Sequence, residues 1–136
     1  MKAYLAGASA ELELCKHWRD RLRAAGVEIT HDWIATIEAV GDANPADASR
    51  EQRAKWADED LDGVANADVF WLLMPPPGRG WGAGVELGYA VGRKDYGTHV
   101  TIVVSGDDSH TIFGGLAPHY FATHEEAFHH ITGQRT

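Results

Sequence analysis

The sequence predicts a single α/β domain over residues 1–136, with a three-layer, flavodoxin-like fold and a five-stranded parallel sheet of order 2-1-3-4-5. Short apolar segments alternate with helical segments along the whole chain, as in parallel sheets whose strands are joined by crossover helices. The segment from Val69 to Met74 is entirely apolar, which is typical of a strand covered on both faces. With 136 residues and no repeats, the chain suffices for one hydrophobic core.

The first half of the chain is predicted to alternate strand, helix, strand, loop and helix. Lys2 to Gly7 and Val27 to Trp33 are the expected strands. Between them, Glu11 to Ala25 carries apolar residues at helical spacing, which indicates a helix with one buried face. Ile34 to Ser49 has no regular apolar period, so we expect a long loop and a candidate lid there. A helix over Glu51 to Asn66 completes this half.

Local signals support that last helix. Ser49 and Gln52 have the spacing of a capping box. The apolar stripe expected to face the core consists of Ala54, Ala57, Leu61 and Val64. Asp60 lies at the edge of this stripe, and Trp56 is expected to be a core residue.

The second half begins with the central apolar strand, which three prolines end. A glycine-rich segment follows, and a helix is expected to open at about Ala83. The remaining strands are predicted over His99 to Ser105 and near His119 to Ala122. Thr123 and Glu126 form a second capping box, which predicts a final helix.

A sheet of this order has a topological switch point between strands 1 and 3, and ligands bind in the crevice outside the carboxyl ends of those strands. The loops that follow strands 1 and 3 should therefore line a ligand site. The expected substrate-binding residues are small residues of these loops and two tryptophans that can stack on a base: Gly7, Ala8, Ser9, Gly80, Gly82, Gly84, Trp33 and Trp81. Glu86 is expected in the first turn of the following helix, where the helix dipole favours an ionised carboxylate.

Several function classes are disfavoured. A net charge of -8 provides no cationic surface for a nucleic acid polymer. The eight histidines show no metal-ligand spacing, so we assign no metal site. The run from Gly78 to Ala83 matches the dinucleotide fingerprint, but it follows the third strand and three prolines, so we assign no nicotinamide or flavin cofactor. The lone Cys15 and the lack of a membrane-spanning segment lead us to expect a soluble cytoplasmic protein.

Four segments together resemble the nucleoside 2-deoxyribosyltransferase family. They are YLAG at 4–7, DLDGV at 60–64, ADV at 67–69 and GAGVELGYA at 82–90. The resemblance covers most of the chain, and the last segment is fairly specific. It implies that Glu86 is the nucleophile toward the anomeric carbon, that Asp60 handles the base and its proton, and that Tyr4 holds the nucleophile through its hydroxyl group.

Two positions depart from the family pattern. Gly80 stands where many transferases have an aspartate and where the related 2′-deoxynucleoside 5′-phosphate N-hydrolases have a serine. Ala8, Ser9 and Ala10 replace the Ser-x-Arg segment with which those hydrolases hold a phosphate. The missing arginine favours a nucleoside over a nucleotide, while Arg79 or Ser9 leaves a phosphate contact open.

The resemblance implies exchange of the base of a 2′-deoxynucleoside through a glycosyl-enzyme on Glu86. Two alternatives stay open: an N-glycoside hydrolase acting on a nucleoside 5′-monophosphate or on NAD, and a non-catalytic nucleotide-binding sensor. The resemblance also implies at least a homodimer. The apolar segment from Ile112 to Phe121 offers a plausible contact surface for it.

Overall fold

The computed structural model describes residues 1–41 and 47–134. It contains one parallel sheet in the order β2-β1-β3-β4-β5, which confirms the predicted fold class and strand order. The strands are β1 (Lys2–Ala6), β2 (Glu28–Ile29), β3 (Val69–Leu73), β4 (Thr101–Ser105) and β5 (His119–Phe121). The helices are α1 (Leu12–Ala24), α2 (Trp33–Val40), α3 (Arg50–Ala65), α4 (Trp81–Asp95) and α5 (His124–Thr132).

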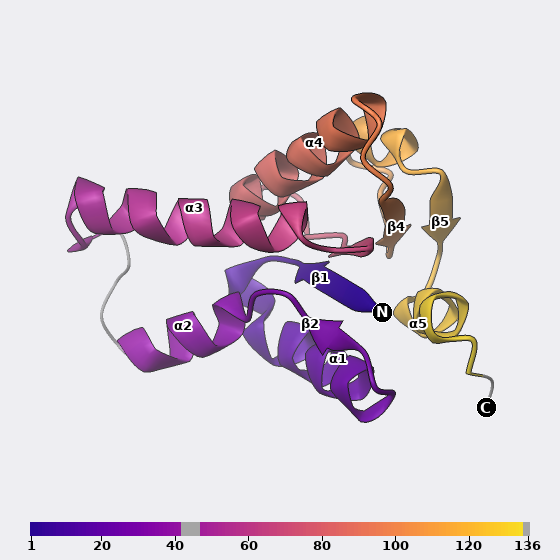
Figure 1. Cartoon of the computed structure of the whole chain (residues 1–136), viewed down its shortest axis with the longest axis horizontal. Helices are drawn as coiled ribbons and strands as arrows, with labels where there is room; N and C mark the ends of the chain where they lie inside the picture. Colours follow the sequence, from indigo (N-terminus) through magenta and orange to yellow (C-terminus); the bar gives the residue numbers. More distant parts are fainter. Residues whose placement is uncertain (42–46, 135–136) are drawn as a thin grey trace.

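Helices cover both faces of the sheet. In Figure 1, α3 and α4 lie on one side of the strands, and α1 and α5 lie on the other. Aromatic contacts hold α1 and α5 against the sheet. The ring centroid of Trp18 on α1 lies 5.6 Å from that of Trp71 on β3 and 5.8 Å from that of Phe128 on α5. No helix in the described part of the chain has the length and apolar character needed to cross a membrane.

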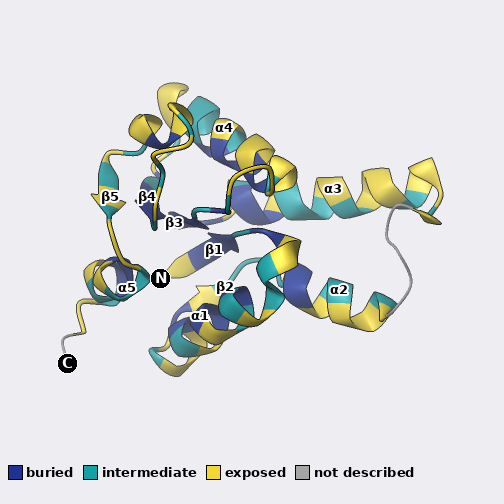
Figure 2. Ribbon diagram, turned by 180° about the vertical axis from the view of Figure 1, so that it is seen from behind, coloured by how far each residue is buried: buried dark blue, intermediate teal, exposed yellow. Residues whose placement is uncertain are grey.

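The core is centred on β1 and β3. Every residue of β3 is buried, as its unbroken apolar sequence predicts. Figure 2 shows the buried residues on these central strands, whereas the outer parts of α2 and α3 are largely exposed. Ala6 of β1 lies beside Leu72 of β3, so these two strands end at the same edge of the sheet. The loops after β1 and β3 therefore meet there.

A buried polar chain fixes α5 against the sheet. The indole nitrogen of Trp71 donates a hydrogen bond of 2.8 Å to Ser105 Oγ, which lies 2.7 Å from Nδ1 of His124. Burial lowers the pKa of His124, so its neutral ring can accept a hydrogen bond from the hydroxyl group of Ser105. The capping prediction next to it is confirmed, because Glu126 donates its backbone N–H to Thr123 Oγ1.

Two of the predicted elements are wrong. The expected loop from Ile34 to Ser49 contains helix α2, and the remaining positions 42–46 of that loop lie outside the described residues. Asp32 initiates α2, because its side chain accepts the backbone N–H of Ala35 at 3.0 Å. As a result, the strand predicted over Val27 to Trp33 shortens to Glu28–Ile29.

The predicted core stripe of α3 is correct only near its end. Ser49 caps this helix through the backbone N–H of Gln52, as expected. Val64 is buried, but Ala54 and Ala57 are exposed, because the first half of α3 extends past the edge of the sheet. Trp56 lies in this half and is only partly buried, so its assignment to the core is wrong.

Candidate active site

A cavity of about 380 Å³ opens at the carboxyl edge of the sheet, where the sequence predicts the ligand site. Residues that follow β1 and β3 line it together with side chains from α2, α3 and α4. The cavity brings together most of the predicted site residues: Gly7, Ala8, Ser9, Trp33, Asp60, Gly80, Trp81, Gly82 and Glu86.

Two predicted residues are not part of this cavity lining. Tyr4 lies within β1 and is fully buried, and it is connected to the site by its hydrogen bond to Glu86. Gly84 lines a different cavity, on the side of α4 that faces Phe113 and Leu116, so the structure does not bring it together with the other predicted substrate-binding residues. Successive helical residues are rotated by about 100°, which places Gly82 and Gly84 on different faces of α4.

Glu86 is the most buried acidic residue that lines the cavity, with 8% of its surface exposed. Helix α4 begins at Trp81, two residues earlier than predicted, so Glu86 lies in the second helical turn and the dipole argument for an ionised carboxylate weakens. Burial raises the pKa of Glu86 to about 8, and the nearby charge of Asp60 acts in the same direction. A hydrogen bond from Tyr4 opposes both effects.

Tyr4 holds Glu86 in place. Its hydroxyl group donates a hydrogen bond of 2.5 Å to Glu86 Oε2, within the core and across 82 positions of sequence. Burial and then the charge of Glu86 raise the pKa of Tyr4, so the hydroxyl group keeps its proton. The pair therefore leaves the other carboxylate oxygen of Glu86 available for a ligand in the cavity.

Asp60 supplies a second carboxyl group to the same cavity. Burial raises the pKa of Asp60 above its ordinary value, although a protonated His31 beside it acts in the opposite direction. His31 Nε2 lies 3.2 Å from Asp60 Oδ1. The site thus combines two carboxyl groups whose protonated forms are favoured by burial, and proton transfer requires groups of this kind.

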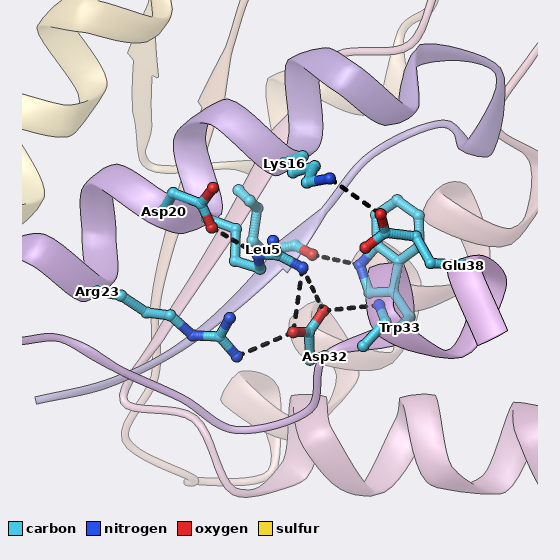
Figure 3. A network of polar contacts seen from close by, with 9 residues as sticks. Leu5, Lys16, Asp20, Arg23, Asp32, Trp33 and Glu38 are labelled. Carbon is cyan, nitrogen blue, oxygen red and sulfur yellow. Dashed lines mark hydrogen bonds and ion pairs between the residues drawn. The ribbon is translucent and has the colours of Figure 1, made fainter.

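Trp33 is anchored at the start of α2. Its indole nitrogen donates a hydrogen bond of 2.7 Å to the backbone oxygen of Leu5. Its neighbour Asp32 accepts hydrogen bonds from Arg19 and Arg23 of α1 (Figure 3). Partial burial alone would raise the pKa of Asp32, but the hydrogen bond from the backbone N–H of Ala35, and then those from the two arginines, lower it and keep the carboxylate charged. This network fixes α2 to α1 and β1, and so fixes one wall of the cavity.

The backbone explains why glycine occupies position 80. Gly80 has a φ of +80°, and a Cβ atom there would lie 2.2 Å from Cγ of Pro75. An aspartate or serine at this position would meet both obstacles. Gly80 contributes no side chain to the cavity, but the preceding residue, Arg79, is exposed and lines it.

The sequence reasoning missed His31 and the site role of Trp56. Both line a smaller cavity that adjoins the main one. Trp56 precedes Asp60 by four residues, so helical spacing alone places the two on one face of α3. No sequence signal indicates His31, because its contact with Asp60 depends on how the β2–α2 connection packs on α3.

Neither a known family model nor a curated protein matches the sequence. Among solved structures, the chain is similar to the CMP N-glycosidase BcmB of Clostridium botulinum, with a TM-score of 0.52. The sequences are 16% identical, and the match covers 96% of this chain and 97% of that one. The likeness shows that this chain has, over nearly its full length, the fold of a known N-glycosidase.

Proposed function

We propose that this protein hydrolyses the N-glycosidic bond of a nucleoside 5′-monophosphate, with Glu86 as the nucleophile. The observation that carries the proposal is the placement of Glu86. Its carboxyl group is buried, oriented by the Tyr4 hydroxyl group, and lines a cavity that also contains Asp60. Most enzymes that hydrolyse glycosidic bonds use a pair of carboxyl groups at the anomeric carbon.

The chemistry uses these groups in two steps. Departure of the base gives C1′ oxocarbenium character, and ionised Glu86 stabilises it and forms a bond from its carboxylate oxygen to C1′. Asp60 donates a proton to the leaving base. Water then attacks C1′, the bond to Glu86 breaks, and Asp60 takes up the proton that the water releases. The enzyme returns to its starting state, and the products are the free base and the sugar phosphate.

Two observations favour a nucleotide substrate and hydrolysis. Arg79 is exposed and lines the cavity, where its guanidinium group can pair with a phosphate. The chain also shares its fold with a protein described as a CMP N-glycosidase. The cavity volume of about 380 Å³ is in the range of small-molecule sites.

Transfer of the sugar to a second base is the other candidate. The GAGVELGYA segment at 82–90 supports it through its resemblance to the nucleoside 2-deoxyribosyltransferase family. Both reactions share the glycosyl-enzyme on Glu86, and they differ in whether water or a base resolves it.

One assay separates the possibilities. The protein is incubated with CMP, dCMP, AMP or deoxyinosine, each with and without added adenine, and bases and nucleosides are separated by chromatography. We expect release of the free base from a monophosphate without any need for adenine. Exchange that requires adenine would favour the transferase. If the assay shows no release of the base and no exchange, the result contradicts the proposal and favours a sensor without catalytic activity.

A further inference from the structure

A second, smaller cavity adjoins the proposed active site. It has a volume of about 110 Å³ and lies between α2 and α3. Trp33, Ile37 and Asp60 line both cavities, whereas His31 lines only the smaller one. Asp60 therefore lines the proposed substrate cavity and also the smaller cavity that His31 lines.

The packing around His31 is specific. Thr30 Oγ1 donates a hydrogen bond of 2.6 Å to the backbone oxygen of Gly63, which holds this segment on α3. A Cβ atom on Gly63 would lie 2.6 Å from Cβ of His31 and 2.9 Å from the ring of Tyr4. Because Gly63 has no side chain, His31 can approach α3 closely enough for its Nε2 to lie 3.2 Å from Asp60 Oδ1.

The charges around Asp60 make this contact important. The ionisable groups that face Asp60 are Glu59 on its own helix, Glu86 on α4, Tyr4 on β1 and His31 before α2, and Arg79 lines the same cavity from the α4 side. The acidic neighbours oppose a negative charge on Asp60. Among the residues that the structure describes, His31 is the one basic group in direct contact with the Asp60 carboxyl group.

We propose that His31 is the proton partner of Asp60: a positioning residue that shares one proton with the carboxyl group and keeps it supplied for departure of the base. This inference rests on the proposed function. A hydrogen bond between an imidazole nitrogen and a carboxyl oxygen needs one proton, which either group can carry. The pair therefore retains a proton to a higher pH than a lone carboxyl group does.

The proton balance closes over one turnover. Asp60 gives its proton to the leaving nitrogen of the base as the bond from C1′ to that nitrogen breaks. The carboxylate of Asp60 then lies beside a neutral His31, and the pair holds no proton between its two groups. When water attacks C1′ and displaces Glu86, the proton released by that water returns to the His31–Asp60 pair.

The test compares His31→Gln, His31→Ala and the wild type, with His99→Gln as the matched control. Glutamine can keep a hydrogen bond to Asp60 but cannot exchange a proton in this pH range. His99 is exposed and precedes β4, at the opposite edge of the sheet. Base release is measured across pH with CMP and with nicotinamide mononucleotide, whose cationic base leaves without being protonated.

We expect both His31 variants to cleave CMP roughly 10- to 100-fold more slowly, a smaller loss than removal of the acid itself typically causes. Their pH optimum for CMP should move to lower pH, while His99→Gln behaves as the wild type does. Cleavage of nicotinamide mononucleotide should change little. A wild-type rate and pH profile in His31→Gln, or equal losses with both substrates, would overturn the inference. If the wild type cleaves only CMP, the inference is tested by whether the pH optimum of the His31 variants moves to lower pH.

A spectroscopic measurement separates this inference from the proposed function. The ring signals of His31 are followed by NMR across pH in the wild type and in Asp60→Asn. We expect them to respond to the ionisation of Asp60 and to lose that response in the variant. Identical titrations would refute the shared proton whatever the activity. A wild type that cleaves none of the monophosphates CMP, dCMP, AMP and nicotinamide mononucleotide would refute the proposed function, and the NMR result would still show whether His31 and Asp60 share a proton.

Discussion

At the level of single residues, Glu86 combines two opposing requirements. A nucleophile must be ionised, yet burial raises the pKa of Glu86 to about 8. Tyr4 reduces this conflict, because its hydrogen bond of 2.5 Å favours the carboxylate form. The ionised form of Glu86 is therefore desolvated and reactive, but at neutral pH only a fraction of the Glu86 carboxyl groups is ionised.

The hydrogen bond from Tyr4 can be tested through the pH dependence of the reaction. We predict that Tyr4→Phe moves the acidic limb of kcat/KM to higher pH, because the carboxylate of Glu86 loses a favourable contact. Activity at pH 7 should fall more than activity above pH 8. The measurement is base release from CMP across pH, in the wild type and the variant. An acidic limb at the same pH in both proteins would contradict this role for Tyr4.

The burial of Glu86 also predicts a pH-dependent cost in stability. The pKa of Glu86 is higher in the folded protein, about 8, than its ordinary value of 4.5. Folding stability should therefore decrease by up to about 1.4 kcal/mol for each pH unit between these values. We predict that Glu86→Gln is more stable than the wild type above pH 8 and that the difference disappears below pH 4.5.

Thermal melts from pH 4 to pH 9 measure this difference. Glu28→Gln serves as the control, because Glu28 is an exposed carboxylate on β2. It reports the effect of losing one surface charge. A Glu86→Gln protein that is less stable than the wild type at pH 9 would contradict the account of Glu86 as a desolvated carboxylate.

At the level of the elements, the N-terminus of α4 depends on one glycine. Gly80 combines a φ of +80° with close contact to Pro75. We predict that Gly80→Ala destabilises the protein by about 1–3 kcal/mol, because the residue must adopt a strained conformation and displace the proline ring. Denaturant unfolding measures this change.

Gly82→Ala is the matched control in the same helix. A Cβ atom at Gly82 would meet no atom within 4 Å, and its φ is not in the left-handed region. Alanine there should stabilise α4 by roughly 0.5–1 kcal/mol. If both variants had the same stability, Gly80 would not be required by the backbone.

The sequence carried enough information for the central strands β1 and β3, but not for the full extent of β2 or for every helix. The apolar run at β3 and the glycine that follows β1 placed the cavity correctly, because strand burial and strand ends have strong local signals. Helix α2 was missed because its short sequence, WIATIEAV, contains β-branched residues and lacks a long apolar period. Its stability depends on the Asp32 cap and on contacts with α1, which only the tertiary structure supplies.

The same limit applies to the site. Glu86, Asp60 and Tyr4 were recognised from motif resemblance, and the structure brings them together. His31 lies 29 positions from Asp60 in sequence, and its contact depends on the space left by Gly63. A missing side chain that permits a contact leaves no periodic pattern, so sequence reasoning could not find it.

At the level of the whole molecule, one face carries a large apolar surface. A cavity of about 660 Å³ lies between α4 and the short 3-10 turn η3 (Phe113–Leu116). The exposed apolar side chains that line it are Trp81, Val85, Phe113 and Leu116, and the exposed Ile112 directly precedes Phe113 in sequence. Surfaces of this kind are typical of contact sites.

We predict at least a homodimer formed through this face. Ile112→Lys should shift the protein toward the monomer, because it replaces an apolar side chain that is 83% exposed in the single chain with a charged one, which the dimer contact would bury. Ala39→Lys on the exposed side of α2 adds the same charge elsewhere. Light scattering at micromolar concentration measures the mass. A wild-type monomer, or a loss of the dimer in both variants, would contradict the assignment of this face.

The central claim is that Glu86 forms a covalent glycosyl-enzyme. The most direct test is mass spectrometry of the protein quenched during turnover of CMP, together with base-release rates for the wild type and Glu86→Gln. We predict a sugar phosphate adduct on the peptide that contains Glu86, and a rate for the folded variant that is lower by about 10²- to 10³-fold or more. An adduct on another residue, or a folded Glu86→Gln protein with a near wild-type rate, would contradict the claim.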